Sequence, residues 1–376
     1  MPVKYTKLIE IKLIDIMARF IALYLPQYHP TPENDEWWGK GFTEWVNVAK
    51  ARPLFHGHKQ PHIPADLGFY DLRLPEIREQ QAELAREAGI EAFCYWHYWF
   101  GNGKRLLERP FNEVLESGKP DFPFCLGWAN HSWYKKLWDP KAKGDNILLI
   151  EQTYPGVEDY VLHFYTLLPA FKDHRYLKVN GKLFFLIFSP GEFDDLESFI
   201  TVWQRLAKEN GLNGFYFVAQ DFDSRNKKKI LSRGINAIYN SDTFNIHHKL
   251  SLFSKVLFLL QRKILRRPTA FEYKDAIKYM VIDDCRNRDV IPCISPNWDH
   301  SPRSGHNSVI LKNSTPNLFK KIAKRAINIV KDKPEEEQII MIKSWNEWGE
   351  GNYMEPDMEF GHGYIEALKE AIEESK

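Results

Sequence analysis

Two glutamates three positions apart, Glu347 and Glu350, follow an apolar run close to the C-terminal end of the sequence. The run Ile339–Ile342 has the length of a buried strand, and acidic side chains are tolerable only where such a strand leaves the core. Glycosidic cleavage needs one protonated and one ionised carboxyl, and apolar walls with neighbouring charge separate the pKa values of two acids. The pattern therefore predicts Glu347 and Glu350 as catalytic residues acting on a carbohydrate, with a buried salt bridge as the structural alternative.

Aromatic and polar side chains recur where other apolar runs of the sequence end. The chain has 12 Trp, 17 Tyr and 25 Phe, and flat aromatic faces can stack on sugar rings while polar neighbours bind hydroxyls. We therefore predict that side chains of these two kinds bind the substrate. They are Tyr24, Gln27, His29, Glu44, Trp45, Trp96, His97, Tyr98, Trp128, Asn130, Gln220, Trp298, Asp299, Trp345 and Asn346.

Several of these residues have a structural alternative. A tryptophan in a strand, such as Trp96, more often fills the core than contacts a ligand, and the segment 297–299 has the composition of a loop cap. A metal site formed by His29, His97 and His131 is not favoured, because these residues lack HxH or HExxH spacing and acidic neighbours. We therefore predict no metal at the site.

The elements that must position these residues are eight short apolar runs, most of them separated by a helical pattern. Pro75 to Ala88 is the clearest helix, because a proline opens it and Gly89 follows it as a stop. Helices are also predicted over Leu196–Asn210 and Leu318–Val330. Repeated strand–helix alternation predicts an α/β fold, and eight repeats favour closure into a (β/α)₈ TIM barrel. The runs are Phe20–Leu25, Ala92–Trp96, Pro123–Trp128, Leu183–Phe188, Phe215–Ala219, Ala237–Tyr239, Val290–Ile294 and Ile339–Ile342.

No Gly-x-Gly-x-x-Gly and no Gly-x-x-x-x-Gly-Lys-Ser/Thr pattern follows any of the runs, so an open nucleotide-binding sheet loses its best support. We predict one barrel domain over residues 19–376, preceded by an extension, residues 1–18, with Met17 as an alternative start. Two loops are long for a barrel, 26–70 and the insertion 241–289, and long loops in compact domains are commonly functional.

The overall composition is that of an ordinary globular protein of 376 residues. Its net charge of +1 gives no general attraction for nucleic acid. The four cysteines have no CxxC spacing and are expected to be core thiols. No apolar stretch reaches the ~20 residues that span a bilayer, and the N-terminus does not have the pattern of a secretory signal, so a cytoplasmic location is expected.

The stretch 249–267 combines six basic residues, no acid and a strongly apolar middle. Such a stretch predicts either a basic amphipathic helix that makes a peripheral membrane contact or an extra helix packed on the barrel.

Five motifs carry a more specific resemblance and span nearly the whole chain. They are Tyr24-Leu25-Pro26-Gln27-Tyr28-His29, Gly41-Phe42-Thr43-Glu44-Trp45, Tyr95-Trp96-His97-Tyr98-Trp99-Phe100, Trp128-Ala129-Asn130, and Trp345-Asn346-Glu347-Trp348-Gly349-Glu350-Gly351 followed by Glu355-Pro356. With these motifs the sequence resembles the WbsX-type glycosyltransferase-like proteins, which in turn resemble the family 99 glycoside hydrolases, the endo-α-mannanases and endomannosidases. The resemblance adds Glu355 to the expected substrate-binding residues.

The resemblance implies a (β/α)₈ barrel and retaining cleavage of a mannose-type α-glycosidic bond in an oligosaccharide or polysaccharide. It implies that Glu347 acts on the sugar 2-hydroxyl, through a 1,2-anhydro intermediate, and that Glu350 is acid and then base at the leaving group. This chemistry needs no metal or cofactor. Asn352 departs from the family pattern, in which a threonine is expected after Glu-Gly, and this concerns sugar contacts rather than the acids.

Two other functions stay open from the sequence. A glycosyltransferase in O-antigen or capsular polysaccharide synthesis would need an activated donor, and Asp221-Phe222-Asp223 has the spacing of a metal–diphosphate site. A glycan-binding module would need stacking and hydrogen bonds but not two matched acids, so the carboxylate pair disfavours it.

Overall fold

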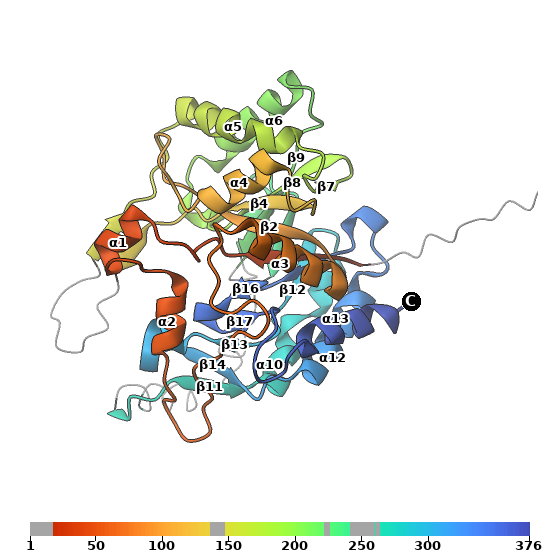
Figure 1. Ribbon diagram of the computed structural model, residues 1–376. Helices are drawn as coiled ribbons and strands as arrows, with labels where there is room; N and C mark the ends of the chain where they lie inside the picture. The colour runs from red at the N-terminus through yellow and green to blue at the C-terminus, as the bar shows by residue number, and fades with distance from the viewer. Residues whose placement is uncertain (1–17, 136–146, 222–225, 241–259, 261–263) are drawn as a thin grey trace, which may run out of the picture.

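The centre of the molecule is a closed ring of parallel strands (Figure 1). The computed structural model describes residues 18–135, 147–221, 226–240, 260 and 264–376. Hydrogen bonding runs in the order β1-β15-β12-β10-β9-β8-β4-β2, and β2 also pairs with β1, which closes the barrel. The barrel strands are β1 (Arg19–Tyr24), β2 (Ile90–Trp99), β4 (Phe124–Trp128), β8 (Lys182–Ile187), β9 (Phe215–Asp221), β10 (Ala237–Asn240), β12 (Val290–Ile294) and β15 (Ile339–Ile342).

Each predicted apolar run coincides with one of these strands, so the predicted (β/α)₈ fold is confirmed. The runs are apolar because both faces of a barrel strand are covered, one by the barrel interior and one by helices. All four residues of β15 are buried, and they pair in parallel with β1 from Arg19↔Ile339 to Ala22↔Ile342.

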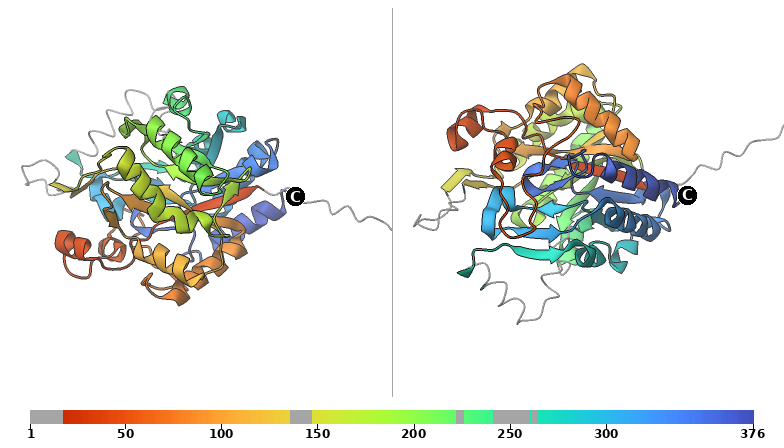
Figure 2. Two further views of the ribbon diagram at one scale, coloured as in Figure 1. Left: turned by 90° about the horizontal axis from the view of Figure 1, so that it is seen from above. Right: turned by 60° about the horizontal axis from the view of Figure 1, so that its bottom comes forward.

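Helices surround the strands, and α12 lies beside α13, which also contacts α3 (Figure 2). The predicted helix 75–88 has the bounds of α3, and the other two predicted helices agree with α6 and α12 to within two residues. The helices are α1 (Pro32–Trp38), α2 (Glu44–Lys50), α3 (Pro75–Ala88), α4 (Arg109–Ser117), α5 (Val157–Lys172), α6 (Leu196–Glu209), α7 (Lys227–Leu231), α10 (Tyr273–Met280), α11 (Ser301–Ser304), α12 (Pro316–Val330) and α13 (Gly363–Glu373).

Short strands outside the ring shape the loops around one end of the barrel. A three-stranded sheet has the order β11-β14-β13, and two hairpins pair β5 with β6 and β16 with β17. The second hairpin encloses the single turn η7, which carries Glu350. The remaining bounds are β3 (Arg105–Leu106), β5 (Trp133–Lys135), β6 (Ile147–Ile150), β7 (Lys178–Val179), β11 (Thr269–Glu272), β13 (Trp298–Asp299), β14 (Val309–Lys312), β16 (Asn346–Glu347), η7 (Trp348–Glu350) and β17 (Asn352–Tyr353).

Both long loops contain secondary structure. The loop after β1 includes α1 and α2, and the described part of the predicted insertion 241–289 includes β11 and α10. Residues 1–17, nearly all of the predicted extension, lie outside the described residues, as does most of the basic stretch 249–267. The membrane contact expected of that stretch therefore stays a prediction.

All four cysteines are buried, as expected of core thiols. Within the described ranges, no helix combines the length and the apolar character required to cross a bilayer.

Candidate active site

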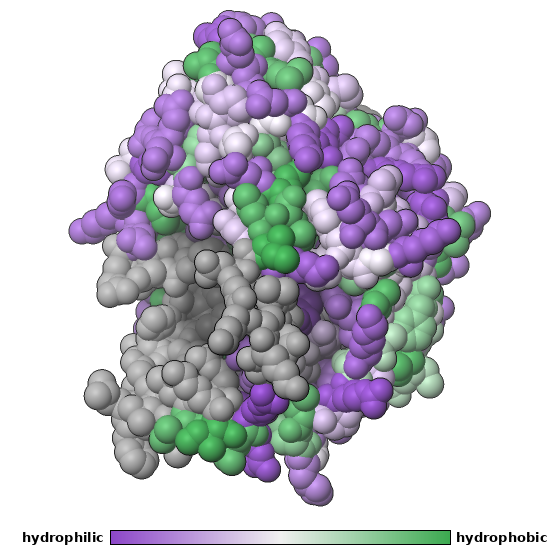
Figure 3. Space-filling model, turned by 90° about the vertical axis from the view of Figure 1, so that its left-hand side faces the viewer, coloured by the Kyte–Doolittle hydropathy of each residue, from purple (hydrophilic) through white to green (hydrophobic). Residues whose placement is uncertain are grey.

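A cavity of about 480 Å³ lies at the barrel end where the strands terminate. Its volume falls within the range of about 300–1,000 Å³ that is typical of ligand pockets. Residues of α1 and α2 form part of its lining, on the face of the molecule that Figure 3 shows. The lining combines aromatic rings with carboxylates and cations, so it has both apolar faces and hydrogen-bonding groups.

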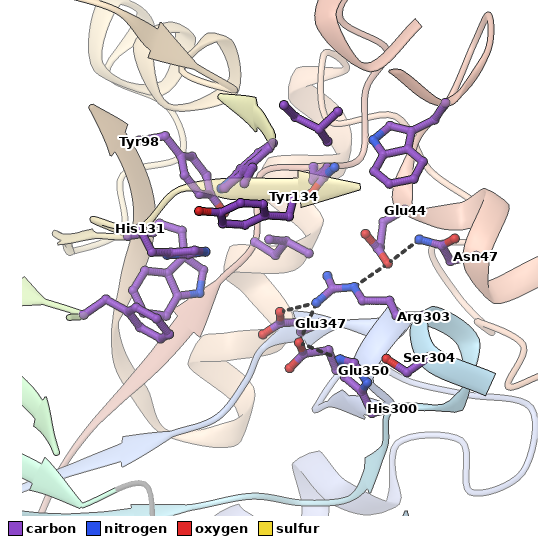
Figure 4. A pocket seen from close by; sticks show the side chains of 18 of the residues that line it. Glu44, Asn47, Tyr98, His131, Tyr134, His300, Arg303, Ser304, Glu347 and Glu350 are labelled. Atoms are coloured by element: carbon purple, nitrogen blue, oxygen red, sulfur yellow. Dashed lines mark hydrogen bonds and ion pairs between the residues drawn. The ribbon is translucent and has the colours of Figure 1, made fainter. Parts of the chain in front are cut away.

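Glu347 and Glu350 face this cavity together, and one arginine contacts both (Figure 4). Arg303 Nη1 lies 3.0 Å from Glu347 Oε1 and 2.6 Å from Glu350 Oε1. Because both oxygens contact the same nitrogen, the two carboxylates lie side by side and can reach one bound sugar, as glycosidic cleavage by a carboxylate pair requires.

A third acid, Glu44, also forms an ion pair with Arg303. Arg303 Nε donates to Glu44 Oε1 at 2.8 Å, and Asn47 Nδ2 donates to the same oxygen at 3.1 Å. Gly349 makes room for this arrangement, since a Cβ at position 349 would lie 1.8 Å from Glu44 Oε1. The guanidinium therefore joins α11, α2 and the β16–η7 turn through charged contacts.

The two acids of the pair are electrostatically unequal. Burial, and then the charge of Glu350, raise the pKa of Glu347, and Arg303 offsets this only in part. Burial also opposes ionisation of Glu350, but Arg303 and His300 outweigh it and hold the pKa of Glu350 well below its usual range. His300 Nε2 lies 3.3 Å from Glu350 Oε1, while Glu347 Oε2 accepts from the Ser344 hydroxyl at 3.2 Å. Of the two acids, Glu347 therefore holds a proton more readily and Glu350 a charge.

Comparison with known proteins gives the family. The family described as "Glycosyltransferase WbsX" matches residues 20–368. The chain belongs to the WbsX family. The matched range, in this family of carbohydrate-active proteins, contains all five motifs that carry the sequence resemblance.

Two curated relatives of this WbsX-family chain are named "Uncharacterized protein WxcX" and come from two strains of Xanthomonas campestris pv. campestris. Each is 32% identical over 363 residues, which cover 94% of this chain and 50% of the relative. The chain thus spans about half the length of the curated relatives it matches.

Solved structures share the fold. The GH99 endo-α-mannosidase from Bacteroides thetaiotaomicron, in complex with bis-tris-propane, has a TM-score of 0.56 at 13% identity and covers 95% of this chain and 97% of its own. A structure described as "Glycoside hydrolase-like protein" has the same TM-score at 14% identity, with 99% and 97% covered. Both comparisons support the TIM-barrel architecture of the WbsX-family chain.

Only some of the predicted substrate-binding residues line the cavity. Those that do are Gln27, Glu44, Trp96 and Tyr98, together with the predicted catalytic pair. In β2, Trp96 and Tyr98 face the cavity, whereas His97 between them points outward and lies 2.8 Å from His163 of α5, Nε2 to Nε2. Strand alternation thus corrects the prediction for His97, because successive side chains face opposite sides.

The other predicted contacts are buried outside the cavity and pack or connect the framework. Trp128 donates to the Trp99 carbonyl, Trp45 to the Tyr70 carbonyl, and Tyr24 to Gln81. Asn130 bonds both backbone groups of Ser189, and His29 bonds the Pro26 carbonyl. The predicted residues that do not line the cavity are Tyr24, His29, Trp45, His97, Trp128, Asn130, Gln220, Trp298, Asp299, Trp345, Asn346 and Glu355.

Three of these residues hold the segments that carry Glu347, Glu350 and Arg303 in place through buried hydrogen bonds. Asn346 bonds the backbone N–H and carbonyl of Leu25, at 2.7 and 3.0 Å, and so fixes the start of β16 to the end of β1. Glu355 accepts from Trp348 Nε1 at 2.6 Å beneath the η7 turn. Asp299 accepts from His58, Gln60 and the Ser301 N–H, which fixes the start of α11.

Sequence reasoning missed most cationic and rim residues of the cavity. Arg303 lies three positions after His300, and its basic charge was the only signal in the sequence. Tyr134 follows the Trp128-Ala129-Asn130 motif by four residues. Lys343 directly follows the apolar run Ile339–Ile342, and its ammonium lies 4.8 Å from the centre of the Trp298 ring. The lining residues that were not predicted as site residues include Trp38, Phe42, Asn47, Tyr134, His300, Arg303 and Lys343.

No group of three or more metal-binding side chains occurs among the residues that the structure describes. The Asp221-Phe222-Asp223 pattern lies partly outside them, since residues 222–225 are not described.

Proposed function

We propose that this WbsX-family chain cleaves a mannose-type α-glycosidic bond with retention, using Glu347 and Glu350 as the catalytic pair. The observation that carries the proposal is the contact of both carboxylates with one nitrogen of Arg303 inside a cavity of about 480 Å³. A purely structural ion pair would not require an open, aromatic-lined hollow around it.

The proposed steps balance as follows. Glu347 removes the proton of the 2-hydroxyl, the 2-oxygen attacks the anomeric carbon, and Glu350 protonates the leaving oxygen. Glu350 then removes a proton from water, which opens the 1,2-anhydro ring at the anomeric carbon, and Glu347 returns its proton to the 2-oxygen.

These roles require a redistribution of the proton, because the surroundings of the pair raise the pKa of Glu347 and lower that of Glu350. Arg303 is the group that must change its contacts. A sugar that draws Arg303 away from Glu350 raises the pKa of Glu350 and favours transfer of the proton to it.

Glu347→Gln and Glu350→Gln, made separately, test the proposal on an α-linked mannobiose and on an aryl α-mannoside with a good leaving group. Each variant should lose about 10²–10⁴-fold in kcat on the disaccharide. Glu350→Gln, which lacks the proposed acid, should recover most of its bond-cleavage rate on the aryl substrate, because the aryl leaving group needs no proton on its oxygen. Glu335→Gln, at an exposed position, is the control. Full hydrolysis by either site variant would remove that residue from its role.

A second candidate is transfer of a sugar from an activated donor in O-antigen or capsular polysaccharide synthesis, which the name of the family favours. Calorimetric titration with a nucleotide sugar and with a polyprenyl-phosphate sugar distinguishes the two. Donor binding with formation of a new glycoside would support transfer, whereas release of free sugar without donor binding would support hydrolysis. Tight glycan binding without either reaction would indicate a glycan-binding module.

A further inference from the structure

Tyr134 is an aromatic residue at the cavity that packs against no other ring in the described part of the chain. It lies in β5, its exposed fraction is 49%, and its ring lines the cavity across from Glu347 and Glu350 (Figure 4). Its hydroxyl has no hydrogen-bond partner among the described residues. Single exposed rings are common on protein surfaces, but a ring at the mouth of a polar cavity is placed where it can stack on a ligand.

The strand that carries Tyr134 is anchored on both sides. Trp133 packs edge-on against Tyr98 and Trp37, with ring centres 5.1 and 6.0 Å apart. Lys135 Nζ donates to the Trp37 carbonyl at 2.7 Å. These contacts tie β5 to α1 and to the barrel strand β2, so Tyr134 is held at the cavity mouth before any ligand arrives.

A second exposed ring extends the same wall. Trp38, at the end of α1, has an exposed fraction of 40% and stacks on Phe42 with ring centres 5.7 Å apart. Lys135 Nζ lies 5.3 Å from the Trp38 ring centre. Trp38, Phe42 and Tyr134, which together form an aromatic wall, line the same cavity as Glu347 and Glu350.

A sugar ring has an apolar C–H face and an edge of hydroxyls, and this wall opposite carboxylates matches both. We propose that Tyr134 and Trp38 form outer sugar-binding subsites, and that the ligand is therefore an oligosaccharide rather than a single sugar unit. The proposal rests on the proposed function for placing one sugar at the glutamates.

The test uses the Glu350→Gln protein, which should not turn substrate over, titrated by calorimetry with methyl α-mannoside and with α-mannose oligosaccharides of two to four units. Affinity should rise by about ten-fold or more with length. Tyr134→Ala and Trp38→Ala in this background should each remove most of that gain, an effect of about ten-fold, while changing the affinity for methyl α-mannoside less than two-fold. Tyr165→Ala is the matched control, since Tyr165 is 47% exposed on α5 and does not line the cavity.

Equal affinity of the Tyr134→Ala and parent proteins for every length, or no binding at any length, would overturn the proposal. Loss of binding to anionic phospholipid vesicles in Tyr134→Ala, with sugar affinity unchanged, would assign the exposed rings to a lipid surface and would also overturn it. Length-dependent binding that needs Tyr134, in a protein whose natural form cleaves no glycoside, would keep the subsites and refute only the proposed catalysis.

Discussion

Arg303 Nη1 lies 2.6 Å from Glu350 Oε1, which makes this ion pair the tightest of the three that the arginine forms. The pair keeps Glu350 ionised despite its burial, and it connects the helix α11 to the turn that follows β16. Both the pH dependence and the stability of the site should therefore depend on one side chain.

Arg303→Met should leave Glu44, Glu347 and Glu350 without their shared counter-charge. Since Arg303 lowers the pKa of both Glu347 and Glu350, both pKa values should rise, and both limbs of the kcat/KM profile should move to higher pH. The free energy of unfolding should fall more at pH 8, where the acids are ionised, than at pH 5. Arg205→Met, which removes an exposed arginine from α6, should change neither profile. An unaltered pH profile in Arg303→Met would contradict the role of the arginine.

Gly349→Ala should displace Glu44, because the added Cβ would lie 1.8 Å from Glu44 Oε1. The loss of the Glu44–Arg303 contact should lower oligosaccharide affinity or kcat/KM by about ten-fold, about 1.4 kcal/mol. Gly191→Ala is the control, since nothing lies within 4 Å of a Cβ at position 191. Kinetic constants for Gly349→Ala that match those of the control would show that the room beside Gly349 is not needed.

Glu355 should make the protein less stable as the pH rises. Burial raises its pKa from 4.5 to about 7 in the folded protein. The native state therefore holds the proton more tightly than the unfolded chain, so this stability is present below pH 4.5 and is lost as the pH rises toward 7. At about 1.4 kcal/mol for each pKa unit, the loss is up to about 3 kcal/mol.

Urea unfolding at several pH values between 4.5 and 8 measures this effect. Glu355→Gln cannot ionise and should flatten the decline, whereas Glu335→Gln at an exposed position should follow the original protein. A decline of the same size in Glu355→Gln would assign it to other groups.

Asn346→Ala should destabilise the fold by about 2–3 kcal/mol, because two buried backbone groups of Leu25 lose their partners. Activity should fall as well, since Asn346 immediately precedes Glu347. Thermal unfolding monitored by circular dichroism checks the stability, with Asn307→Ala at an exposed position as the control. A melting temperature equal to that of the control would show that the link from Asn346 in β16 to the end of β1 is dispensable.

The sequence by itself determined the barrel, its strands and the position of the two acids. Apolar runs such as Ile339–Ile342 arise because both faces of a barrel strand are buried. This requirement for apolar residues applies to each strand separately, so it can be read from each segment of the sequence. The end of an apolar run then marks the end of a barrel strand, which is why the sequence alone could place Glu347 and Glu350 at the rim of the barrel.

Only the tertiary structure decided which rim side chains face the cavity. His97 and Tyr98 are neighbours in one motif, yet the pleat of β2 sends one toward α5 and the other into the hollow. Arg303 and Tyr134 come from loops whose paths depend on contacts distant in sequence, such as Asp299 with His58 and Lys135 with Trp37. Local patterns cannot encode such contacts, because each depends on where two separate segments meet once the barrel has closed.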